Sequence, residues 1–137
     1  MAKVRPLTPA ARAQLKKDFE AIPERMRHAA KKLIDETAAR IVDQMKLGSP
    51  DGEGALDASI RAEDISTESW LRVRVSAGGP LTTRQTASGR PYDYARAIEY
   101  GTSDTPPQPF FRPVRDRERK KFNARLRNTL KKAAQDS

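Results

Sequence analysis

The chain has 137 residues, a length that predicts one domain. Leu, Ile, Val and Phe make up only 24 of them, so we expect a small core that gains stability from neighbouring subunits. The 27 Lys and Arg residues oppose 18 Asp and Glu, and the net charge of +9 favours acidic partners. The absence of cysteine excludes disulfides and thiolate metal sites, and the single histidine excludes a multi-histidine centre. No apolar run is long enough for a membrane span, and no apolar segment of a secretory signal is expected at the start.

Charge is distributed unevenly along the sequence. Residues 1–47 carry 11 basic and 6 acidic side chains, residues 48–109 carry 6 and 9, and residues 110–137 carry 10 and 3. An acidic middle therefore separates two basic ends. If these segments form separate surfaces, opposite charges on neighbouring copies would fix the register of an assembly.

The first predicted element is a long helix over residues 8–47, which shows apolar side chains at helical spacing. Pro23 interrupts this spacing, and a proline inside a helix removes a hydrogen bond, so we expect a kink or a break there. Gly48 and the following Pro50 predict the end of the helix. Residues 1–7 precede the helix and are predicted to be flexible.

Two strands are predicted next, after a turn at residues 49–54 that is rich in Gly, Pro and Asp. Residues 56–65 form a weak strand candidate. Residues 69–77 are a better one, because polar and apolar side chains alternate with the period of a half-buried strand. A turn over residues 66–68 would join the two as an antiparallel hairpin. Residues 78–91 are polar and bounded by Gly and Pro, which is typical of a long mobile loop or an extended hairpin.

Residues 92–100 predict a short helix that Gly101 ends. Residues 101–113 form a Pro-rich arm, because prolines hold the chain extended. The last helix begins near residues 111–113 and ends at Ala134. The sequence thus predicts one α+β domain over the whole chain, with a long N-terminal helix, a small antiparallel β-sheet, a short helix and a long C-terminal helix.

The sequence lacks the common motifs of enzymes. The chain has no glycine-rich dinucleotide loop, P-loop, zinc-protease helix or nucleophile elbow. The adjacent carboxylates Glu63 and Asp64 would point to opposite faces of a strand, so they would not act on one substrate. The sequence therefore predicts a protein without catalysis, cofactor or metal.

The most distinctive segment is residues 94–113. Gly101 permits a turn, and Pro106-Pro107 stiffens the arm, which lowers the entropy cost of docking it. Glu99 would satisfy backbone N–H groups or pair with an arginine of the same or a neighbouring subunit. The alternative is an ordinary connection between two helices, with its aromatic side chains in the core. The candidates for a subunit interface are Tyr94, Glu99, Tyr100, Gly101, Thr102, Gln108, Pro109, Phe110 and Phe111.

The predicted last helix is crowded with basic side chains. Such a helix can neutralise DNA phosphates, dock on an acidic protein, or be solvated. The sequence shows no helix-turn-helix or other base-reading motif. The candidates that would face an acidic partner or DNA are Arg112, Arg115, Arg119, Lys120 and Arg127.

A known phage family resembles this chain in the pattern Tyr94-Ala95, Glu99-Tyr100-Gly101-Thr102, Gln108-Pro109-Phe110 and Arg112-Pro113. It is the family of neck or tail-completion proteins of long-tailed phages, the gene-product-ten-like proteins of lambdoid type. The segment before the first strand is similar as well, through Pro50, Gly54, Leu56, Ser59 and Ile60. The resemblance covers about residues 10–133.

The resemblance implies a structural virion protein of the head–tail junction, assembled in the host cytoplasm and without catalysis. By analogy with tail terminators, the subunits are expected to form a ring, most simply a hexamer, that closes or caps the tail tube. The implied partners are other copies, adjacent neck, connector or tail-tube proteins and, non-specifically, packaged DNA, with no membrane. The alternative is a small basic DNA-binding module of a mobile element. On the first interpretation, Phe110→Ala or Glu99→Ala blocks head–tail joining and leaves the monomer folded.

Overall fold

The structure is a computed structural model that describes residues 6–50, 54–67 and 70–135. Parts of four predictions lie outside the described residues: residues 1–5 of the flexible start, residues 51–53 of the first turn, residue 68 of the hairpin turn and residue 69 of the second strand.

The predicted N-terminal helix is broken into α1 (Pro9–Ala21) and α2 (Glu24–Gly48). Pro23 lies between them in an extended conformation, so the proline breaks the helix instead of bending it. Thr8 caps α1, and its hydroxyl accepts a hydrogen bond from the Ala11 N–H at 3.2 Å. All residues of α1 are exposed or half-buried, whereas α2 contributes to the core.

The predicted strand over residues 56–65 is wrong in its first half, where the chain forms the short helix α3 (Ala55–Ser59). Leu56 and Ile60 are both buried, and a spacing of four residues puts them on one side of a helical turn. The Ser59 hydroxyl donates to the Leu56 carbonyl at 2.6 Å, which closes this turn.

The predicted hairpin is confirmed by β1 (Arg61–Asp64) and β2 (Val73–Ser76), which are antiparallel. Arg61 lies opposite Ser76, and Asp64 lies opposite Val73. The second strand is shorter than predicted from residues 69–77. Beyond the two strands, the pairing continues through a hydrogen bond from the Ile65 N–H to the Arg72 carbonyl and an isolated bridge between Thr67 and Trp70.

The long polar segment forms the second of its two predicted alternatives, a hairpin. A 3-10 turn (Pro80–Thr82) leads into β3 (Thr83–Gln85), which pairs with β4 (Pro91–Asp93). The following helix, α4 (Tyr94–Tyr100), therefore begins two residues later than predicted. Asp93 ends β4 and also caps α4, because its side chain accepts from the Ala95 N–H at 3.0 Å.

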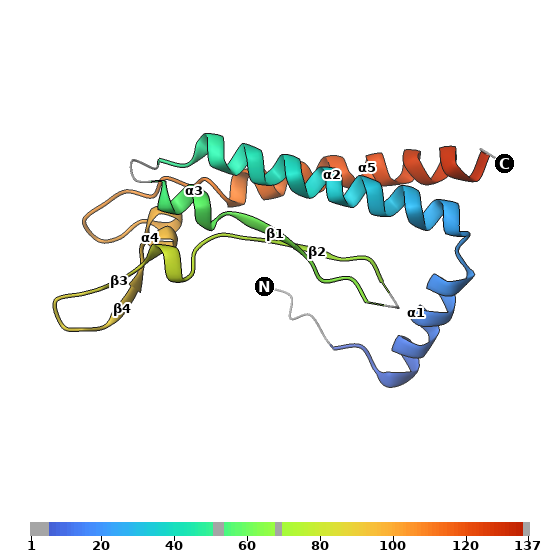
Figure 1. Ribbon diagram of the computed structural model, residues 1–137, viewed down its shortest axis with the longest axis horizontal. Coiled ribbons are helices and arrows are strands. Elements are labelled where there is room, and N and C mark those ends of the chain that lie inside the picture. Colours follow the sequence, from blue (N-terminus) through green and yellow to red (C-terminus); the bar gives the residue numbers. More distant parts are fainter. Residues whose placement is uncertain (1–5, 51–53, 68–69, 136–137) are drawn as a thin grey trace.

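The last helix, α5 (Arg112–Gln135), agrees with its prediction within a residue and runs antiparallel beside α2 (Figure 1). The β1–β2 hairpin extends along the same helix pair. The β3–β4 hairpin projects near α3 and α4, and α1 diverges at the opposite end. The fold is α+β, with two separate two-stranded antiparallel sheets. The buried apolar cluster is small and consists of Met45, Leu56, Ile60, Ala95, Phe110 and Val114.

Candidate assembly interface around Glu99

The carboxylate of Glu99, in the last turn of α4, holds the start of α5. Its Oε2 accepts from the backbone N–H groups of Phe110 at 2.9 Å and Phe111 at 3.0 Å. Its Oε1 accepts from the N–H of Arg112 at 2.9 Å and from the Arg112 Nε at 3.1 Å. The first N–H groups of a helix have no partner within the helix. Glu99 therefore caps α5 from a different helix.

Glu99 is only 5% exposed, yet it is stabilised as the anion. Burial disfavours the charged carboxylate, but the N–H groups of Arg112, Phe111 and Phe110 and the Arg112 side chain outweigh it. Together they hold the pKa of Glu99 below its usual value. The sequence left open whether Glu99 binds backbone groups or an arginine, and the structure shows both within one chain.

Gly101 starts the arm with a backbone that suits only glycine. Its φ is +77°, and a Cβ there would lie 2.8 Å from the Pro107 nitrogen and 3.0 Å from the Thr105 carbonyl oxygen. The Thr102 hydroxyl then accepts from the N–H groups of Asp104 at 3.3 Å and Thr105 at 3.1 Å. The turn is therefore built by close packing and by local hydrogen bonds.

The arm returns to α4 before it reaches α5, because the Gln108 N–H donates to the Ile98 carbonyl at 2.8 Å. Every residue from 102 to 109 is exposed, although both ends of the segment are anchored. Beside it, Tyr100 is 56% exposed, and the Arg112 guanidinium lies 4.4 Å from its ring centroid. This exposed, pre-shaped surface of Tyr100 and residues 102–109 is called the arm surface below.

The nine interface candidates from the sequence fall into three groups. Glu99 and Phe110 are buried in the chain's own core, so they shape the arm surface from inside. Tyr94, Gly101 and Phe111 are half-buried. The exposed members are Tyr100, Thr102, Gln108 and Pro109. Because Glu99 and Phe110 hold the monomer together, we no longer expect their alanine variants to leave it folded.

The five basic candidates are also divided by the structure. Arg112 is engaged by Glu99 and Tyr100, and the Arg115 Nε lies 3.1 Å from the Asp116 carboxylate. The three that lie exposed along α5 are Arg119, Lys120 and Arg127.

Two further carboxylates that join separate elements of the fold were not singled out from the sequence. Glu118 is 1% exposed and lies on the side of α5 that faces α2. It accepts from Arg40 Nε at 3.4 Å, Gln44 Nε2 at 3.2 Å and Arg125 Nη1 at 3.5 Å. The sequence does contain a signal for Glu118, which is an acidic residue at an apolar position of the helix. Such a residue needs a partner when it is buried.

Asp93 is the second such carboxylate. It accepts from the Thr82 hydroxyl at 2.6 Å, the Gly79 N–H at 2.9 Å and the Ala95 N–H. Burial opposes its ionisation, but these bonds hold the pKa of Asp93 below its usual value. Asp93 thus joins the 3-10 turn to the start of α4.

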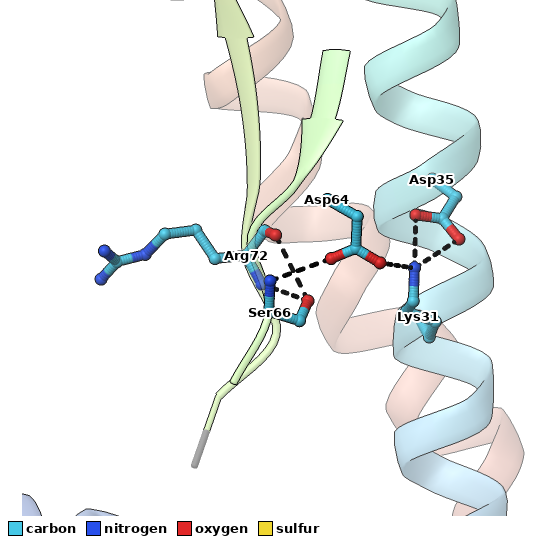
Figure 2. A network of polar contacts seen from close by, with 5 residues as sticks. All are labelled: Lys31, Asp35, Asp64, Ser66 and Arg72. Carbon is cyan, nitrogen blue, oxygen red and sulfur yellow. Dashed lines mark hydrogen bonds and ion pairs between the residues drawn. The ribbon is translucent and has the colours of Figure 1, made fainter. Parts of the chain in front are cut away.

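The β1–β2 hairpin is tied to α2 by a polar network (Figure 2). Lys31 Nζ lies 2.7 Å from Asp64 on β1 and 2.8 Å from Asp35 on its own helix. The Ser66 N–H donates to Asp64 at 3.0 Å, and the Ser66 hydroxyl accepts from the Arg72 N–H at 3.0 Å. Hydrogen bonds from Lys31 and Ser66 hold the pKa of Asp64 well below its usual value.

Folding therefore changes the charge pattern that the sequence predicts. Asp64, Asp93 and Glu99, three carboxylates of the acidic middle, are occupied within the chain. The arginines of that segment at positions 72 and 74 are exposed. The middle of the sequence does not form an acidic face among the described residues, and docking between copies cannot rest on that simple charge division.

The described residues form neither a metal-binding cluster nor a membrane-spanning helix. No group of three or more His, Asp or Glu side chains is arranged to hold a metal ion there. None of the helices in the described ranges is long and apolar enough to cross a membrane.

A protein-family model matches residues 13–101, about two thirds of the chain, and is described as "Bacteriophage HK97-gp10, putative tail-component". The chain belongs to this HK97 gp10-like family. It is therefore a structural component of a phage tail. The family match includes Glu99 and Gly101 and ends where the arm begins. No match was found among the curated proteins or the solved structures.

Proposed function

We propose that this HK97 gp10-like protein is a ring-forming component of the phage neck, which completes or terminates the tail tube where it joins the head. Family membership supports the tail role. The observation that carries the finer proposal is the arm surface, which is exposed over residues 102–109. One end is anchored by the Gly101 N–H on the Ala97 carbonyl, and the other by the Ile98 carbonyl and Glu99. Because this surface is already ordered, docking it loses little conformational entropy.

In this mechanism the protein acts by assembly and not by catalysis. The arm surface contacts an adjacent neck, connector or tail-tube protein, and copies of the chain associate head-to-tail into a ring, most simply a hexamer. The site of action is the head–tail junction of the virion. The prolines at positions 106, 107 and 109 keep the arm stiff and present few backbone N–H groups, so side chains would supply the contacts.

The test introduces charge and bulk on the arm surface without touching its anchors. Asp104→Arg combined with Gln108→Arg changes two exposed side chains, since only their backbone N–H groups bond within the chain. We expect a folded monomer and at least a tenfold loss of joined particles, counted by electron microscopy after gene replacement in the parent phage.

The matched control places the same two arginines on another exposed segment, as Gln85→Arg with Ala87→Arg in the β3–β4 hairpin. This variant keeps the added charge but leaves the arm surface intact, so it should join heads and tails normally. Equal particle yields from both double variants would refute the role of the arm surface.

Contact with packaged DNA is a second candidate, favoured by the exposed side of α5. Asp116 is the one exposed acidic residue among the described residues of that helix, against several exposed lysines and arginines, among them Arg119, Lys120, Lys121, Arg127, Lys131 and Lys132. Phosphate contacts of this kind weaken steeply with salt. This contact would be supported if the purified protein binds DNA at low salt and is released at physiological salt.

A further inference from the structure

The β1–β2 hairpin has two open edges, and its register defines which backbone groups face outward. The Ile65 N–H donates to the Arg72 carbonyl, and the Thr67 N–H donates to the Trp70 carbonyl, both at 2.9 Å. In an antiparallel pair, hydrogen-bonded and non-hydrogen-bonded positions alternate. The same register continues through the hairpin, so Glu63 and Arg74 are a hydrogen-bonded pair.

The alternate residues therefore turn their backbone N–H and C=O groups away from the partner strand. On β1 these residues are Ala62 and Asp64, and on β2 they are Val73 and Val75. No third strand of the described chain pairs with either edge. Both edges are templates for another strand.

A groove lies along the outer edge of β2. Helix α2 packs on both strands of the hairpin, and α5 packs beside α2. Packed helices stand about 8–10 Å apart but paired strands only about 4.8 Å, so a two-helix layer is wider than a two-stranded sheet. This difference in width leaves a groove between β2, α2 and α5 with a volume of about 290 Å³. Its apolar walls include Ile34, Ile41, Val73, Val75, Phe111 and Phe122.

Strand β1 offers the second open edge. All four of its residues are exposed. Its charged side chains are paired within the chain, Glu63 with Arg61 at 3.3 Å and Asp64 with Lys31 at 2.7 Å. The match between β1 and the edge of β2 beside the groove therefore rests on their outward backbone groups and not on charge.

From this match we infer that β1 of one copy pairs with the outer edge of β2 in the next copy, in the groove beside α5. This inference deepens the proposed ring and rests on it. In a ring whose axis runs along the strands, rotation keeps the strand direction, so the new pair is antiparallel, as β1 and β2 are within one chain. Each copy offers β1 to one neighbour and β2 to the other, a head-to-tail contact that can close into a ring.

The first test uses the absence of cysteine in the chain. Two single variants, Ala62→Cys with an affinity tag and Val73→Cys without one, are mixed and treated with a short bis-maleimide, whose length tolerates a shift of register. We expect a tagged heterodimer of twice the 15.3 kDa chain mass. Each variant alone should yield less dimer, because a head-to-tail contact does not bring the same position of two copies together.

The matched control replaces Ala62→Cys by Ala39→Cys, an exposed alanine on α2. Equal yields of heterodimer with the two tagged variants would overturn the strand pairing, since they would show only random collision. The alternative, that the charges of β1 merely protect the edge of a monomer, predicts this result.

The second test uses proline, which lacks the N–H group. Ala62→Pro removes an outward N–H and keeps the hairpin ladder, whereas Glu63→Pro removes a donor of the ladder itself. Light scattering should show that Ala62→Pro is a folded monomer under conditions in which the wild-type chain assembles. The pairing is wrong if Ala62→Pro assembles like the wild-type chain or if the wild-type chain remains monomeric. In either case, arm variants that still block head–tail joining would preserve the proposed neck function.

Discussion

The two ends of the molecule differ in how far contacts within the chain stabilise them. Around Glu99, buried carboxylate oxygens accept hydrogen bonds from the N–H groups of Phe110, Phe111 and Arg112 at the start of α5, so the chain supplies its own partners. At the other end, α1 is a capped helix in which Leu15 remains 40% exposed and no residue is buried. Arg27 of α2 stacks over Phe19 of α1 at 5.5 Å, a contact at the surface. The Glu99 end therefore contributes buried residues to the monomer, and α1 contributes none.

The largest expected effect comes from removing the carboxylate cap. Glu99→Ala leaves three backbone N–H groups without their acceptor, at a cost of about 1–3 kcal/mol for each buried group. We expect the free energy of unfolding to fall by about 3–5 kcal/mol, measured by urea denaturation. Asp104→Ala, on the exposed arm, is the control and should change it by less than about 0.5 kcal/mol. Equal midpoints for the two variants would contradict the assignment of Glu99 as a cap.

The next largest effect is expected at the turn after Glu99. Gly101→Ala places a Cβ 2.8 Å from the Pro107 nitrogen at a positive φ, and backbone atoms cannot move aside as a flexible side chain can. We expect a loss of about 2–3 kcal/mol in the free energy of unfolding. Gly48→Ala is the matched control, because a Cβ there meets nothing within 4 Å. Equal melting temperatures for Gly101→Ala and Gly48→Ala would show that the arm is not packed as described.

A smaller effect is expected from acid. The pKa of Glu99 is lowered in the folded chain, so its ionisation stabilises the fold above its unfolded pKa of about 4.3. This contribution is lost as the pH falls through the folded pKa. Asp93 acts in the same direction.

Urea denaturation of the wild-type chain between pH 7 and pH 3 should therefore show falling stability. Glu99→Gln keeps the shape of the side chain but removes its titration, so it should lose part of this dependence. An unchanged pH profile in Glu99→Gln would mean that other carboxylates carry the effect.

The smallest effect on the monomer is expected from removing residues 1–22. Because α1 buries no side chain, the remaining chain should melt within a few degrees of the full chain. Pro23 marks a natural boundary, since α2 begins after it. If circular dichroism showed that the truncated chain no longer folds, the monomer would need α1, and the two ends would not differ as described.

Local sequence patterns predicted most of the helices, the first hairpin and the α+β class. They succeeded where a short-range rule decides the outcome: Pro23 breaks a helix, Gly101 ends one, and alternation marks β2. They failed at α3, where five residues at helical spacing were too short to distinguish from a strand.

The candidate site was predicted in part. The segment around Glu99 could be singled out from the sequence because its combination of Glu, Gly, Pro and aromatic residues resembles that of a phage family. Which of its side chains face outward could not be predicted, because that depends on how α5 returns to α4. Glu118 shows the same limit, since its partners lie 74 and 78 residues away in the chain.

The positive net charge, the family resemblance and most of the helices follow from the sequence alone, because composition and local spacing decide them. Where the charges act depends on the tertiary structure. Folding places Asp64, Asp93 and Glu99 against donors of the same chain, so the acidic middle of the sequence does not form an acidic face. It also decided that β2 borders a groove, because two packed helices are wider than two paired strands.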